Sequence, residues 1–118
     1  MTAALGDARS MALWAGDEGA QAPAAVFNAG PINLAKFANG RVVGNVYVDS
    51  AGTLEVIQEN VPGAGGLVFN VTVDATQPNF NYPFSIQIFA PYVTIRWTQG
   101  AGASTFLRGS VNALPQPQ

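Results

Sequence analysis

The sequence contains no cysteine and no histidine. Disulfide bonds are therefore excluded, and so are the Cys and His ligands on which structural zinc sites depend. At 118 residues the chain has the size of one domain, and such a domain buries enough surface to hold together without covalent or metal staples. We expect a single domain stabilised by packing alone, with no cofactor and no metal site.

Charged residues are also scarce, at 10% of the chain, against about 25% in typical soluble domains. Two explanations fit this scarcity. The surface can be polar but neutral, or other protein chains can cover part of it. We expect the second, a homo-oligomer or an assembled state.

The few charges exclude two classes of partner. The net charge is −2 and the cations are scattered singly, so no basic patch for nucleic acid is expected. No apolar run approaches the ~20 residues of a membrane-spanning helix. The N-terminal segment lacks the basic start and the uninterrupted apolar run of a signal peptide, which predicts synthesis in the cytoplasm.

The residue types needed for catalysis do not occur in a usable pattern. Serine and threonine have no histidine or cysteine beside them to form an activated nucleophile. Glu55 and Glu59 are four residues apart on a predicted strand, about 13 Å along the chain, which is too far for a carboxylate pair. We interpret both as solvated edge charges and expect no enzymatic activity.

From residue 24 onward, apolar and polar residues alternate with the period of two that is typical of strands. The clearest predicted strands span residues 41–49, 53–59, 67–73, 84–90, 92–98 and 104–111, with weaker ones at 24–28 and 32–37. Trp97 alternates with Val93 and Ile95 and is predicted to be in the core. The connections are short and rich in glycine and proline, so they leave no room for crossover helices. The pattern predicts an all-β fold, an antiparallel β-sandwich of about seven or eight strands, jelly-roll-like.

Residues 1–23 differ from the rest, being rich in alanine and glycine and without alternation. We interpret them as an N-terminal extended arm, flexible or ordered on assembly, with residues 24–113 as the sandwich domain and 114–118 as a tail. Trp14 in this arm either folds back onto the domain or anchors on a neighbour.

Several aromatic and apolar side chains are predicted to point away from the core, and such groups on a weakly charged surface usually mark a contact with protein. The predicted contact residues are Trp14, Phe80, Tyr82, Phe89, Tyr92 and Arg96. A sandwich has two outer faces and loops to cover some of these groups, which is the alternative explanation.

The segment VYVDSAGTL at residues 46–54, then Ile57-Gln58, then APYVTIRW at residues 90–97, a glycine turn at Gly100 and Phe106-Leu107-Arg108 form a familiar series of strands and turns. It resembles small β-sandwich structural proteins of tailed-phage virions, such as head-decoration and head-fibre proteins. The Ser-x-Asp-Gly-x-x-Trp hairpin that members often carry is replaced here by residues 59–66.

This resemblance implies a noncatalytic protein of the outer capsid surface, made in the host cytoplasm. It also implies assembly with itself, commonly as a trimer, and binding to the major capsid protein or another virion protein. A second hypothesis is a carbohydrate-binding module or fibre tip, in which Asn79, Asn81 and Tyr82 would contact sugars, with Trp97 only if it lay outside the core.

Overall fold

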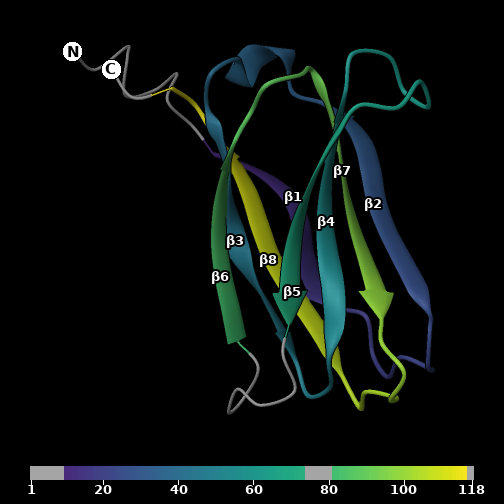
Figure 1. Ribbon diagram of the computed structural model, residues 1–118. Coiled ribbons are helices and arrows are strands. Elements are labelled where there is room, and N and C mark those ends of the chain that lie inside the picture. Colours follow the sequence, from purple (N-terminus) through teal and green to yellow (C-terminus); the bar gives the residue numbers. More distant parts are fainter. Residues whose placement is uncertain (1–9, 74–80, 117–118) are drawn as a thin grey trace.

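The computed structural model describes residues 10–73 and 81–116. Eight strands form two four-stranded sheets that face each other (Figure 1). Sheet I has the order β1-β8-β3-β6 and sheet II the order β2-β7-β4-β5. The strands are β1 (Met11–Asp17), β2 (Val26–Asn33), β3 (Arg41–Val48), β4 (Gly52–Glu59), β5 (Leu67–Val73), β6 (Asn81–Gln87), β7 (Tyr92–Gln99) and β8 (Leu107–Leu114). A 3-10 turn, η1 (Ala35–Phe37), lies in the connection between β2 and β3.

All strand pairs are antiparallel, which confirms the all-β antiparallel prediction. The first strand pairs with the last, β2 with β7, β3 with β6 and β4 with β5. Two further pairs, β3 with β8 and β4 with β7, join these into the two sheets. The eight strands therefore pair like one long antiparallel hairpin whose tip is the connection between β4 and β5. The paired strands are distributed over two sheets.

Alternation along the strands decides which side chains fill the space between the layers. On β4 and β7 the inward residues include Leu54, Val56, Ile95 and Trp97, all with no exposed surface. Trp97 therefore lies in the core, as its alternation predicts. The other buried core members are Leu13, Trp14, Leu34, Val42, Val46, Val48, Val73, Ile88, Val93, Leu107, Val111 and Ala113.

The prediction of an N-terminal arm is wrong for residues 11–17. They form β1, which pairs with β8 at the edge of sheet I, with one register shift between Ala12 and Trp14. Leu13 and Trp14 are only 7% and 5% exposed and belong to the core. The segment lacks intrinsic strand propensity, so its strand conformation comes from pairing with β8 and from burial of these two side chains. Residues 1–9 lie outside the described part of the chain.

Other boundaries differ from the predicted ones by a few residues. A single strand, β2, replaces the two short pieces expected there, and its register shifts between Ala29 and Ile32, around a cis Gly30–Pro31 bond. The sixth strand starts at Asn81 rather than at residue 84, because its edge position tolerates Pro83. The last strand runs three residues later than predicted and includes Leu114, which was assigned to the tail.

Candidate interaction surface

Trp14, a predicted contact residue, is not accessible to a partner in this structure. Its ring lies 5.1 Å from that of Phe27 on sheet II, and its indole N–H donates to Glu18 Oε2 at 3.1 Å. The side chain joins the two sheets at the β1–β2 side of the molecule. It therefore belongs to the packing of the domain, the alternative that the sequence left open.

Tyr82 also differs from its predicted place. It belongs to β6, where it stands opposite Val46 and packs half-buried against the core. The sequence had placed it in an outward loop, because proline and asparagine around it concealed the start of the strand. Phe80 lies outside the described residues, as does Asn79.

Tyr92 and Arg96 lie on the outer face of sheet II, on alternate positions of β7. The Arg96 guanidinium donates from Nε to Asn28 Oδ1 at 2.9 Å and approaches Glu55 Oε1 at 3.9 Å. Its side chain is 41% exposed, so it remains accessible while held by two neighbours. Tyr92 stands opposite Asn33 and Glu59, nearer the β6–β7 connection.

Among the predicted contact residues that the structure describes, Phe89 is the most exposed. It follows β6, is 57% exposed, and stacks on Phe69 of β5 with ring centroids 5.8 Å apart. One face of its ring is therefore fixed against sheet II while the other meets solvent. An ordered, exposed aromatic side chain is suited to contact, because little conformational entropy is lost when a partner covers it.

A residue absent from the predicted set, Gln58, holds this connection in place. Its side chain is 1% exposed and lies on the inward side of β4, in step with Leu54 and Val56. The amide donates to Gln87 O at 2.8 Å, and its oxygen accepts from the N–H groups of Phe89 at 2.6 Å and Ala90 at 3.2 Å. The sequence carried a signal for it, since a polar residue at an inward position of a strand requires buried partners.

A pocket of about 250 Å³ lies beside Phe89, between η1 and the β6–β7 connection. The two connections are tied by backbone bonds from Leu34 N to Pro91 O at 2.6 Å and from Ile88 N to Gly40 O at 2.8 Å. The pocket is lined by Leu34, Ala35, Ala38, Asn39, Ile88, Phe89, Ala90 and Pro91. Asn39 is the one polar side chain in this lining, so the pocket is lined mainly by apolar side chains.

The connection between β4 and β5 lies at the same end of the sandwich as η1 and the β6–β7 connection, uppermost in Figure 1, and it carries further exposed apolar side chains. Val61 in the β4–β5 connection is 60% exposed and Leu67 at the start of β5 is 51% exposed. We call Val61, Leu67, Phe89 and the pocket the apolar end. Lys36 of η1, next to the lining residue Ala35, is an exposed cation at this end.

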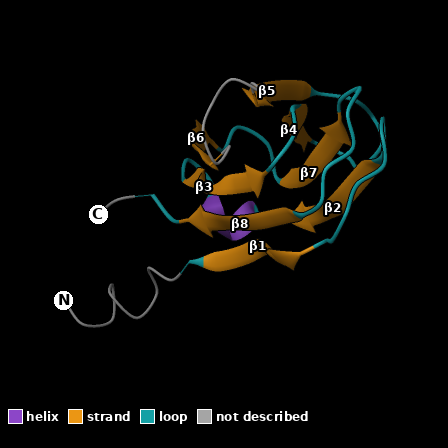
Figure 2. Ribbon diagram, turned by 90° about the horizontal axis from the view of Figure 1, so that it is seen from below, coloured by secondary structure: helices purple, strands orange, loops and turns teal. Residues whose placement is uncertain are grey.

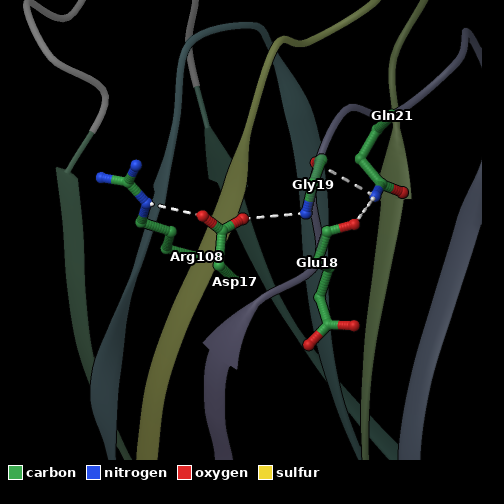
Figure 3. Close-up of polar contacts among 5 residues, drawn as sticks. All are labelled: Asp17, Glu18, Gly19, Gln21 and Arg108. Carbon is green, nitrogen blue, oxygen red and sulfur yellow. Dashed lines mark hydrogen bonds and ion pairs between the residues drawn. The ribbon is translucent and has the colours of Figure 1, made fainter.

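Acidic groups gather at the opposite end, where the β1–β2 connection begins (Figure 3). Asp17 accepts from Arg108 Nε at 3.1 Å and from the Gly19 N–H at 2.8 Å. The Gly19 hydrogen bond, and then the Arg108 side chain, hold the pKa of Asp17 below its ordinary 3.8. Gln21 Nε2 donates to the carbonyls of Glu18 at 3.2 Å and Gly19 at 3.4 Å, so the connection is fixed by polar contacts.

Asp49, directly after β3, lies at the same end and binds the segment that leads into β8. It accepts from the Thr105 N–H at 2.9 Å and from the Thr105 hydroxyl. The hydroxyl bond is the main cause of a pKa below 3.8 for Asp49. Nearby, the buried Gln99 accepts from Trp97 Nε1 at 3.0 Å and donates to Gly102 O at 2.8 Å. At each end of the sandwich a buried glutamine, Gln58 or Gln99, thus fixes the connections that it contacts.

The carboxylates on sheet II serve structural contacts. Glu55 pairs with Arg96, and Glu59, predicted to be a solvated edge charge, is 9% exposed and accepts from the Gly65 N–H at 2.8 Å. Within residues 10–73 and 81–116, no group of three or more acidic, Cys or His side chains comes close enough to hold a metal ion. No helix in that part of the chain is long and apolar enough to cross a membrane.

The apolar end therefore offers a surface for contact. At the opposite end, the carboxylates of Asp17 and Asp49 are hydrogen-bonded within the chain. Comparison with known protein families, with curated proteins and with solved structures finds no match for this chain.

Proposed function

We propose that the chain is a non-enzymatic virion structural protein that decorates or cements the outer capsid surface and associates with copies of itself. The observation that carries the proposal is the apolar end. There Phe89, which lines an apolar pocket, and Leu67, at the start of β5, are both more than half exposed, in a chain with few charges to keep such a surface soluble. Exposed apolar groups gathered in one place usually mark a protein contact.

The strand pairing supports the same class of protein. We propose that the fold is a jelly roll, because the first and last strands pair and each inner pair follows in order. Jelly rolls are frequent in viral capsid proteins but also occur in lectins and cupins. Since a fold alone does not determine function, the pairing supports the proposal only together with the apolar end.

The mechanism would be mechanical. A rigid sandwich whose apolar end buries Phe89 against a junction of capsid subunits binds the assembled shell and not its free subunits. Binding to one state alone stabilises that state by mass action, so the shell would resist disassembly better when the chain is bound. No step of this mechanism needs a cofactor or a metal.

The test is co-sedimentation of the purified chain with phage particles recovered from the source of the sequence. We expect binding by the native chain and weaker binding by Phe89→Ser. Val26→Ser is the matched control, because Val26 is 54% exposed but starts β2 at the other end of the sandwich. Absence of binding to particles, or equal loss with both variants, would contradict the proposal.

A carbohydrate-binding role receives no specific support from the described residues. Trp97 is fully buried and Tyr82 faces inward, so neither presents a free ring to a sugar. Reproducible binding on a glycan array, together with no binding to particles, would favour this role over the virion role.

A further inference from the structure

The four outermost strands of the two sheets differ in how they are protected against pairing with another chain. An edge strand exposes unpaired backbone N–H and C=O groups, and proteins that stay monomeric usually interrupt such edges with proline, bulges or charge. Three of the four edges here carry such an interruption. Pro83 lies within β6, the register of β1 shifts between Ala12 and Trp14, and that of β2 shifts around Pro31.

The fourth edge, β5, carries no such interruption. Its sequence, LVFNVTV, has no proline, glycine or charged residue, and its register with β4 is continuous over all seven residues. Its exposed side chains include Leu67, Val68 at 48% exposure and Asn70. Seen from below, β5 lies at the outer margin of the molecule, on the side away from β1 (Figure 2).

We propose that β5 pairs antiparallel with β5 of a second copy, across a two-fold axis at Asn70. Only the register centred on Asn70 pairs all seven residues of the strand with its copy. It places Leu67 opposite Val73 and Phe69 opposite Val71, so inward residues meet inward residues and the two copies of sheet II become one continuous sheet.

The chemistry of the strand favours a second copy as the occupant. Without charges, two identical strands meet with no like-charge repulsion, and the two Asn70 carboxamides can donate to and accept from each other. The pairing would also cover Leu67 and Val68. It deepens the proposed function by naming the surface used between copies, and it replaces the trimer expected from the resemblance with a two-fold dimer.

The test is light scattering coupled to size-exclusion chromatography of the purified chain over a dilution series. We expect a dimer for the native chain. In Asn70→Lys, two like charges would face each other at about 5 Å, so the dimer dissociation constant should rise about tenfold or more. Asn70→Asp should behave in the same way. Because Asn70 is exposed on the outer face, neither variant disturbs the core, and circular dichroism checks that each is folded.

Mixing the two variants tests the register directly. An equimolar mixture of Asn70→Lys and Asn70→Asp should recover a heterodimer, since opposite charges then meet at the axis. Ala15→Lys, which adds the same charge on the exposed β1 edge, should remain dimeric.

A monomeric or trimeric native chain, a dimer unaffected by Asn70→Lys, or no heterodimer in the mixture would overturn this interface. The readout is separable from the proposed function, because it uses the free protein, whereas the virion role is tested by binding to particles.

Discussion

The indole ring of Trp14 lies directly on Gly109, in the space that a Cβ at that position would occupy. Gly109 is on β8 and stands opposite Gly16 of β1, two positions along the ladder from the pair formed by Trp14 and Val111. The absence of a side chain at residue 109 thus lets the ring reach the core and contact the Phe27 ring in a tilted arrangement. A similar relationship holds on sheet II, where a Cβ at Gly52 would overlap the ring of Trp97.

From this contact we predict that Gly109→Ala destabilises the domain by about 1–3 kcal/mol, the usual cost of an added group in a packed core. Trp14→Ala should cost about 3–5 kcal/mol, because a large buried side chain is lost. In the double variant the added methyl group should cost less than it does alone, since the ring it displaces is gone. Urea denaturation measures all three, with the exposed Ser110→Ala as control. Additive effects would contradict the contact.

A deletion distinguishes a strand from an arm at the N-terminus. Removing residues 2–22 takes away β1 with Leu13 and Trp14, and it leaves the edge of β8 unpaired. Because these contacts belong to the fold, we expect the shortened chain to lose cooperative thermal unfolding. If residues 2–22 were a free arm, their removal would leave thermal unfolding unchanged. Removal of residues 2–9 leaves β1 in place and is the matched control. Unchanged unfolding of the longer deletion would show that β1 contributes nothing to the fold.

Gln58→Leu should destabilise the protein although it replaces a polar side chain with an apolar one inside the core. The change removes the partners of the Phe89 and Ala90 N–H groups and of the Gln87 carbonyl. Unpaired buried groups cost about 1–3 kcal/mol each. Because these three groups are only partly buried, water can replace some of the lost bonds, and we expect a net loss of about 2–4 kcal/mol in the free energy of unfolding. Gln116→Leu, at an exposed position, should change little. Amide hydrogen exchange at Phe89 should also become faster in Gln58→Leu, and unchanged exchange would argue against the bond.

Acid should weaken the end closed by Asp49. Its pKa lies below 3.8 in the folded chain, so this carboxylate stabilises the protein above that pH, and the stabilisation is lost as the pH falls through the lower, folded value. We therefore expect the stability difference between the native chain and Asp49→Asn to be largest near neutral pH and to close below pH 3.8. Thr105→Val, which removes the main cause of the lowered pKa, should reduce the same pH dependence. Chemical denaturation at a series of pH values measures it, and a difference independent of pH would contradict the assignment.

The sequence was sufficient to predict the strands whose alternation is strong. β3, β4, β5 and β7 lie within one or two residues of their predicted bounds, because Val, Ile and Leu at every second position leave one way to bury an apolar face. Strand β1 was missed, since Ala12, Ala15 and Gly16 give it no alternation of its own. Its conformation depends on β8, which lies at the other end of the sequence.

The candidate surface was predictable only in part. Phe89 was predicted to point outward, and the structure leaves it exposed. The remainder depends on contacts between segments distant in the chain, such as the hydrogen bonds of Gln58 with residues 87–90 and the pocket between η1 and the β6–β7 connection. Alternation in the sequence predicts which face of a sheet a side chain occupies, but it does not predict which loops meet at the end of that sheet.

The position of β8 between β1 and β3 determines when the domain can finish folding during its synthesis. Neither neighbour can complete its hydrogen bonds until residues 107–114 have left the ribosome, and until then Leu13 and Trp14 have no sheet to join. A premature stop codon ahead of residue 107 would remove an interior strand and leave sheet I in two pieces. Such long-range closure slows folding and prolongs the exposure of apolar side chains to chaperones, so sheet I is completed only after residues 107–114 have emerged.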